Sequence, residues 1–283
     1  MKKIFCCLTL TFVFACVSFA DGSGVRKYAL GTIEFIAVKD MDTNLGKSIL
    51  LKPDAPVVKS VMFDGQNPSS INVFVVKTKD KNILIDTGNG AGGDMFANLS
   101  SIGISPDDFG IIVITHMHGD HVNGLVSAGG VRNFKNAKVY IAKLEFNYWL
   151  NTVNVKNLAK QIKAVYGDDL KMFEYGENIT PEIKALSAIG HTPGHTIFEV
   201  SSGSEKILVV GDIVHNIKVQ TADPSMSVAF DSDPQKAAQT RRKIFRDAAK
   251  DKIKIAGMHI PFPGIGYLTE NAGDKYTYDP TYK

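Results

Sequence analysis

Four potential metal ligands fall within six residues, directly after an apolar run. His116, His118, Asp120 and His121 follow the segment Ile111–Thr115. Alternate side chains of an extended backbone point the same way, so the first two histidines can bind one ion. A turn at Gly119 would present Asp120 and His121 to a second ion nearby. Imidazole and carboxylate suit zinc and are also compatible with manganese or iron. Because three of the chain's seven histidines lie here, a chance polar loop is disfavoured.

Further candidate ligands lie at the ends of predicted strands downstream. His195 lies in a turn before a strand, Asp212 follows one directly, and His259 comes after the apolar run Ile253–Met258. Strand ends of an α/β core converge on one site, so these residues and the hexapeptide together could hold two metals. His191, four residues before His195, is expected to shape the loop.

The elements that must position these residues are short and mixed in type. Strands are predicted from runs rich in Val, Ile and Phe at Thr32–Val38, Ile71–Lys77, Asn82–Ile85, Ile111–Thr115, Lys138–Ile141, Thr196–Val200 and Lys206–Val210. Helices are predicted at Gly93–Ile102, Ala142–Trp149, Val155–Val165 and Pro234–Ala249. The last helix should begin at Asp233, with a proline in its first turn. Strands cluster first and later alternate with helices, which indicates a layered α/β fold with mixed sheets.

The N-terminal segment has the features of a signal peptide. Two lysines precede the uncharged run Ile4–Ala20, and small residues at its end favour cleavage after Ala20. The run has 17 residues and no basic stop, which argues against a membrane anchor. We therefore expect a periplasmic or secreted protein with no stable membrane insertion after cleavage. A lipoprotein attached through Cys16 is the alternative.

The rest of the chain, residues 21–283, has no linker or repeat and is expected to form one domain. The 283 residues carry a net charge of +3, with 44% hydrophobic and 22% charged residues, which is typical of a soluble globular protein. No basic excess is available to neutralise phosphates, so no nucleic-acid partner is expected. The partner expected is a small-molecule substrate. A homodimer is compatible with this composition. All three cysteines lie in the first 16 residues, which excludes a cysteine metal ligand in the mature chain.

The motifs occur in an order that resembles the metallo-β-lactamase superfamily. They are Asp86-Thr87-Gly88, the segment His116–His121, Pro193-Gly194-His195-Thr196, Gly211-Asp212 and His259. The resemblance implies an αββα sandwich of two mixed β-sheets flanked by helices, with a dinuclear site at one edge. It implies that one ion is held by His116, His118 and His195. It assigns the other to Asp120, His121 and His259. Asp212 and a hydroxide would bridge the ions, and Asp86 would orient ligands.

Segments outside the ligands resemble the branch that contains methyl parathion hydrolase and secreted lactonases. They are Gly211–Asn216, Val219-Gln220, Asp231–Pro234, Thr240–Arg242 and His259–Gly264. His215 stands three residues after Asp212, where quorum-quenching lactonases commonly carry a tyrosine, which weighs against acyl-homoserine lactones as preferred substrates. Asp231 and Asp233 are expected to cap the last helix. Arg241 and Arg242 should lie on its surface or pair with loops.

The resulting hypothesis is an exported, dinuclear metal-dependent hydrolase of lactones or esters, with phosphotriesters as side substrates. The bridging hydroxide would attack the substrate, and one ion would polarise the carbonyl or phosphoryl oxygen. Asp120 and His215 are the candidate catalytic residues, with His215 assisting the oxyanion or the leaving group. Phe262, Pro263 and the loop Phe63–Ser70 would form an apolar rim. A glyoxalase II-like thioesterase and a non-catalytic metal-binding protein on the same fold are the alternatives.

Overall fold

The computed structural model describes residues 24–152 and 156–280, whose strands form two seven-stranded sheets. The expected signal peptide, residues 1–20, and the three cysteines lie outside the described residues. No helix in the described ranges has the length and apolar character that a bilayer-spanning segment requires.

The first sheet is built from the N-terminal half of the chain, in chain order. Its strands are β1 (Val25–Leu30), β2 (Ile33–Asn44), β3 (Pro68–Lys77), β4 (Asn82–Ile85), β5 (Phe109–Ile114), β6 (Lys138–Ala142) and β7 (Leu170–Phe173). Strands β1 to β4 pair antiparallel and β4 to β7 pair parallel, so the sheet is mixed.

The second sheet is built from the C-terminal half. Its strands are β8 (Asn178–Thr180), β9 (Ile183–Ser187), β10 (Thr196–Ser202), β11 (Glu205–Gly211), β12 (Lys254–Gly257), β13 (Ile265–Asn271) and β14 (Lys275–Asp279). Only β11 and β12 pair parallel among these described strands, and the other pairings are antiparallel.

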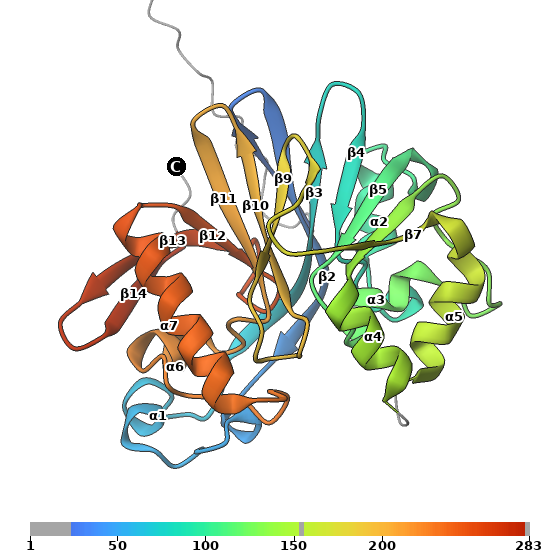
Figure 1. The fold of residues 1–283 in the computed structure, drawn as a ribbon. Coiled ribbons are helices and arrows are strands. Elements are labelled where there is room, and N and C mark those ends of the chain that lie inside the picture. The colour runs from blue at the N-terminus through green and yellow to red at the C-terminus, as the bar shows by residue number, and fades with distance from the viewer. Residues whose placement is uncertain (1–23, 153–155, 281–283) are drawn as a thin grey trace, which may run out of the picture.

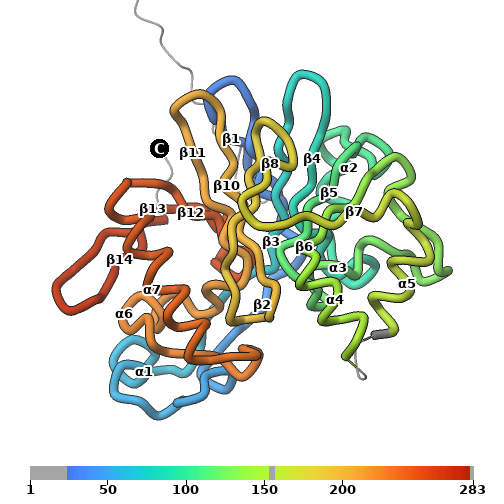
Figure 2. Tube along the Cα trace, in the orientation of Figure 1, coloured from blue at the N-terminus to red at the C-terminus, as the bar shows by residue number. Residues whose placement is uncertain are grey.

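Helices cover the outer face of each sheet (Figure 1). They are α1 (Pro56–Val61), α2 (Met95–Ser101), α3 (Gly119–Val122), α4 (Lys143–Asn151), α5 (Lys156–Tyr166), α6 (Ile217–Ala222) and α7 (Pro234–Lys250). Short 3₁₀ turns lie at η1 (Lys47–Ile49), η2 (Gly90–Gly92), η3 (Pro106–Asp108), η4 (Asn123–Leu125) and η5 (Gly167–Asp169). Helices α2 to α5 lie on the side of the first sheet, and α6 and α7 on the side of the second. The blue trace of α1 departs from this division and lies beside α6 (Figure 2).

Apolar residues fill both faces of the central strands, which explains their continuous hydrophobic runs. Phe35 of β2 and Val209 of β11 belong to the core between the sheets. Their neighbours point the other way, because side chains alternate along a strand. Ile36 packs in the core under the helices of the first sheet, and Leu208 packs in the core under α7. The predicted αββα sandwich is therefore confirmed.

Each of the seven strands and four helices predicted from the sequence is present, with β4 at the predicted bounds. Helix α7 begins as predicted, since the Asp233 carboxylate accepts the backbone N–H of Lys236 at 2.9 Å. Arg242 forms an exposed ion pair with Asp274 at 2.8 Å. Arg241 also pairs with loops but not from the surface, because its buried guanidinium donates to the carbonyls of Ile213, Pro224 and Met226.

Candidate metal centre

The candidate ligands come together because the strands that carry them end at one edge of the sandwich. The parallel strands β4 and β5 lead directly to Asp86 and His116. The parallel strands β11 and β12 lead in the same way to Asp212 and His259. Parallel neighbours present their carboxyl ends side by side, so each pair delivers two side chains to the same place.

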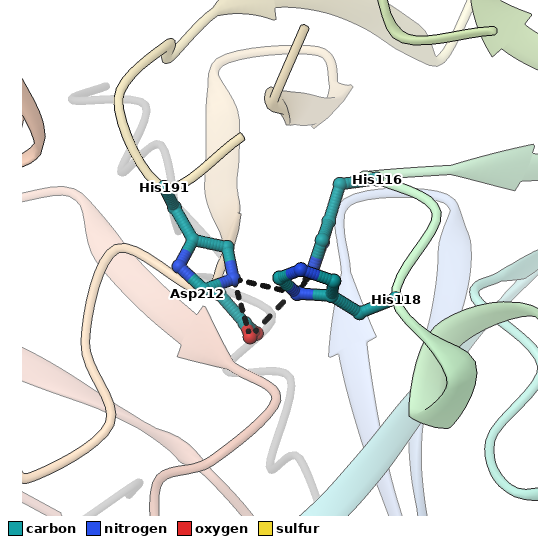
Figure 3. Close-up of side chains that lie close together, drawn as sticks. All are labelled: His116, His118, His191 and Asp212. Atoms are coloured by element: carbon teal, nitrogen blue, oxygen red, sulfur yellow. Dashed lines mark hydrogen bonds and ion pairs between the residues drawn. The ribbon is translucent and has the colours of Figure 1, made fainter. Parts of the chain in front are cut away.

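One group of possible ligands contains three histidines and a carboxylate. His116, His118, His191 and Asp212 each place one ligand atom within 4.8 Å of the others (Figure 3). The Nδ1 atom of His118 lies 2.9 Å from His116 Nε2 and 3.0 Å from His191 Nε2. His191 Nε2 lies 3.3 Å from Asp212 Oδ2. These nitrogen and oxygen atoms are of the kinds that bind zinc.

A second group lies beside the first and contains Asp120, His121 and His259. His259 Nε2 is 3.3 Å from Asp120 Oδ2. Asp212 contacts this group as well, with Oδ1 3.2 Å from His121 Nε2 and Oδ2 3.2 Å from His259 Nε2. The Asp212 carboxylate therefore lies between the two groups.

The expectation that His195 completes the first group is not met, because His191 occupies that place. The Nε2 atom of His195 accepts the backbone N–H of Asp212 at 3.0 Å. A Cβ at Gly211 would lie 2.6 Å from the same nitrogen, so glycine is what allows this close approach. His195 thus holds the end of β11. The loop-shaping role that was expected for His191 is played by His195.

Two carboxylates outside the groups hold histidines in place. Asp86 lies 2.7 Å from His121 Nδ1, which fits the orienting role expected for it. Its backbone has a φ of 60°, a strained conformation for aspartate. Asp231 lies 3.0 Å from His191 Nδ1 and accepts the backbone N–H of Val228. The expectation that Asp231 caps α7 was therefore wrong, since its carboxylate faces His191.

The carboxylates and imidazoles of the centre shift the pKa values of one another. Burial would raise the pKa of Asp212, but the surrounding histidines, chiefly His121 and His259, hold it well below its usual value. Burial and the neighbouring His191 lower the pKa of His118 to about 3. Burial opposes the charged form of His121, yet Asp212, Asp120 and Asp86 raise the pKa of this histidine well above its usual value.

The residues present fit a divalent cation. His121 Nε2 and Asp212 Oδ1 are buried 3.2 Å from each other, and neither makes a well-formed hydrogen bond to a described residue. Buried polar atoms are rarely left unpaired, because each costs free energy comparable to a lost hydrogen bond. A cation between the groups would satisfy both atoms, and imidazole with carboxylate is a suitable donor set.

His215 lies at the same centre, beside the second group. Its Nε2 is 3.1 Å from Asp212 Oδ2, and its ring stacks on His259 with centroids 5.0 Å apart. Burial lowers the pKa of His215 to about 4, despite the opposing effect of Asp212. The side chain is therefore a neutral imidazole near pH 7.

A cavity of about 230 Å³ opens over these groups. Its polar floor is formed by His118, Asp120, His191, Asp212, His215 and His259. Its wall is formed by Thr43, Leu45, Ile71 and Phe230. The predicted rim was wrong, because Phe262 packs against the core between the sheets and the loop Phe63–Ser70 does not line the cavity. No lysine or arginine is among the described residues that line it.

Sequence reasoning missed His191, Asp231 and the apolar wall. Both His191 and His195 were noticed in the sequence, but their spacing does not determine which of the two rings faces the metal centre. Asp231 lies two residues before Asp233, the residue that does cap α7, and its contact with His191 bridges 40 positions of the chain. Leu45 and Phe230 carry no local signal, since 185 positions separate them and only the fold brings them to one cavity.

Known proteins match the chain over most of the described residues. The family model of the metallo-beta-lactamase superfamily matches residues 67–256. A solved hydrolase of the beta lactamase superfamily, AbOPH, is 31% identical and covers 93% of this chain and 99% of its own, with a TM-score of 0.85. AidC, a dizinc quorum-quenching lactonase solved with the product N-hexanoyl-L-homoserine, is 27% identical with the same coverage and a TM-score of 0.84.

A curated relative is matched over a shorter stretch. The N-acyl homoserine lactonase AiiA of Bacillus thuringiensis subsp. kurstaki is 25% identical over 155 residues. The match covers 54% of this chain and 57% of that protein. The chain therefore spans little more than half the length of the curated relatives it matches.

Proposed function

The chain belongs to the metallo-beta-lactamase superfamily, and from this premise we propose that it is a metal-dependent hydrolase of lactones and esters. The cavity that joins possible metal ligands to an apolar wall is the observation that carries the proposal. Similarity to the lactonase AidC over 93% of the chain supports it.

We assign one ion to His116, His118 and His191, and the other to Asp120, His121 and His259. Asp212 lies between the two groups and would contact both ions. Zinc is the metal proposed, because the donors are imidazole and carboxylate and AidC is a dizinc enzyme. When bound, the two ions would supply a bridging hydroxide as nucleophile at neutral pH and polarise the substrate carbonyl.

Two side chains of the cavity have proton-transfer roles in this proposal. Asp120 is partly exposed to the cavity and would accept the proton released during attack. His215, as a neutral imidazole, has one N–H to donate to the oxyanion or to the departing alkoxide. Its backbone N–H donates to Gln220 Oε1 at 2.8 Å, and stacking on His259 holds the ring, so the donor is already positioned.

The lining of the cavity favours neutral substrates. Leu45, Ile71 and Phe230 would contact an alkyl or aryl group while the ester carbonyl faces the histidines. Phosphotriesters are also neutral, so the same cavity supports phosphotriesterase activity as a side reaction. A glutathione thioester is anionic, and the absence of lysine and arginine from the described lining disfavours the glyoxalase II-like alternative. A non-catalytic metal-binding protein is disfavoured because candidate ligands for both ions are present.

Hydrolysis assays with zinc-loaded protein test the proposed activity. Protein purified after expression of the full chain should open dihydrocoumarin and cleave an aryl ester, with a slower reaction on an aryl phosphotriester. The variant His118→Ala should lose these activities. Preferential turnover of a lactoylglutathione thioester would favour the glyoxalase II-like alternative. Tight zinc binding without turnover of any of these compounds would favour a binding protein.

Export is proposed separately, from the N-terminal sequence. Residues 1–20 would direct the chain out of the cytoplasm and be removed after Ala20. Mass spectrometry of the mature protein from the periplasm or medium should find Asp21 at the N-terminus. A lipid-modified N-terminus at Cys16 would identify a lipoprotein, and an intact Met1 on cytoplasmic protein would contradict export.

A further inference from the structure

A buried carboxylate in α4 contacts both loops that carry the first group of ligands. The side chain of Glu145 is fully buried and accepts four hydrogen bonds. Oε1 accepts from the backbone N–H of Met117 at 2.9 Å and from the indole N–H of Trp149 at 2.8 Å. Oε2 accepts from the hydroxyl of Thr192 at 2.8 Å and from the backbone N–H of Gly194 at 2.9 Å.

The partners of Glu145 adjoin the first group directly. Met117 stands between His116 and His118, and Thr192 follows His191. One carboxylate therefore joins two loops that are about 75 positions apart in the chain. Parallel pairing of β5 with β6 brings this about, because α4 begins directly after β6 at the same sheet edge as His116.

Two further contacts tie Glu145 to the ligand loops, one through its backbone and one through Trp149. A Cβ at Gly194 would lie 2.2 Å from the backbone nitrogen of Glu145, so only glycine lets the turn pack this closely on α4. The ring of Trp149, held by Oε1, meets the His118 ring edge-on with centroids 5.5 Å apart. Backbone and side-chain positions in the first group thus depend on the same residue.

The second group has its own outer carboxylate, and none of the hydrogen bonds of Glu145 within the described residues goes to that group. Asp86 holds His121 through Nδ1 at 2.7 Å. The first group has two buried acids outside it, Glu145 in α4 and Asp231 at Nδ1 of His191. Of these two, Glu145 is the one that joins both ligand loops.

From this arrangement we infer that Glu145 is a positioning residue that sets the affinity of the first metal site alone. This inference rests on the proposed metal-dependent function. Every donor to Glu145 except the Thr192 hydroxyl is an N–H, and each carboxylate oxygen receives at least one of them. A glutamine amide would turn an N–H₂ group toward such a donor, so Glu145→Gln must release one of the contacts.

Stepwise metal binding to the apoprotein tests the inference without an activity measurement. Competition with a chromophoric chelator gives the two zinc affinities, and His191→Ala and His259→Ala identify which step belongs to which group. Glu145→Gln should weaken the step that His191→Ala removes by about 10- to 100-fold, as loss of an outer partner does at other metal sites. The other step should be unchanged.

Matched variants separate positioning from general stability. Thr192→Val removes the hydrogen bond from the Thr192 hydroxyl to Glu145 and should weaken zinc binding at the first site to a smaller extent. This variant provides the test if Glu145→Gln does not fold. Asp40→Asn alters another buried carboxylate, which accepts the N–H groups of Asn89 and Met95, and should leave both steps unchanged. Equal weakening of both steps by Glu145→Gln, or no weakening of either, would overturn the inference. Failure of the unaltered protein to bind zinc would instead overturn the proposed function.

Discussion

The imidazole of His191 lies between two carboxylates, with Nδ1 3.0 Å from Asp231 and Nε2 3.3 Å from Asp212. A carboxylate at one ring nitrogen fixes the orientation of a histidine and raises the basicity of the other nitrogen. Asp231 therefore prepares Nε2 of His191 for a cation. His195 has no such partner among the described residues, because its Nε2 accepts a backbone N–H and its Nδ1 is unpaired.

Replacing each of these histidines by alanine should give different metal contents. His191→Ala should retain one of two zinc ions and lose hydrolytic activity by more than the roughly 10- to 100-fold typical of outer partners. His195→Ala should keep both ions, with a lower melting temperature because the end of β11 loses its support. Atomic emission spectroscopy after gel filtration measures the content. If His195→Ala lost one zinc ion and His191→Ala kept both, His195 rather than His191 would be the third histidine of the first metal site.

Zinc affinity should increase with pH up to about 9. Burial opposes the charged form of His191, but hydrogen bonds to Asp212 and Asp231 raise its pKa to about 9. Below that pH the apoprotein holds a proton that an incoming cation must displace, so acid weakens binding. Calorimetric titrations in buffers of different ionisation enthalpy should report proton release at neutral pH. Affinity that does not change between about pH 6 and 9 would contradict this charge balance.

The sequence predicted those parts of the molecule that local pattern determines. The residues Ile112, Val113 and Ile114 are fully buried on alternating faces, so the composition of this run alone indicated a central strand. The hexapeptide after it could be recognised without any distant partner. Strand β14 was missed because Lys275–Asp279 is polar and lies at the edge of a sheet. Helix α6 was missed because its six residues include β-branched Ile217, Val219 and Thr221, which disfavour helices.

The remaining errors concern contacts between distant segments. His191 and His195 share one turn, and only the packing of that turn against β11 and α4 decides which ring faces the centre. The contacts of Glu145 with the ligand loops could not be predicted, because its donors Met117 and Gly194 lie 28 and 49 positions away. Such partners leave no local signal in the sequence.

Arg241 should be far more important for stability than its neighbour Arg242. Arg241→Met would leave the buried carbonyls of Ile213 and Pro224 without this donor and would remove one of two donors to Met226, so it should lower the free energy of unfolding by about 3 kcal/mol or more. Arg242→Met would remove only a half-exposed ion pair with Asp274, worth about 0–1 kcal/mol. Urea denaturation of both variants gives the comparison. Equal losses would show that burial of Arg241 is not the cause.

Chelation should lower the melting temperature. The two groups bring carboxylates and imidazoles together, and a bound cation stabilises only the folded arrangement. At a free zinc concentration 100 times the dissociation constant, one site should add about 2.7 kcal/mol to the free energy of unfolding. Differential scanning calorimetry before and after chelation, and again after zinc is returned, measures the effect. His118→Ala should respond less, and no response in the unaltered protein would contradict metal binding.

Phe230 should set the preference for the acyl or aryl group of the substrate. Its ring is half-exposed and lies 6.0 Å from the His215 ring, at the boundary between the apolar wall and the proposed donor. Phe230→Ala should raise KM for a p-nitrophenyl octanoate by roughly tenfold, which corresponds to about 1.4 kcal/mol of lost apolar contact. The acetate should be affected much less, because its short chain leaves the wall uncovered. Phe63→Ala is the matched control, since this phenylalanine is 93% exposed and does not line the cavity. An equal loss of kcat/KM on both esters would indicate that Phe230 acts by positioning His215 rather than by contacting the substrate.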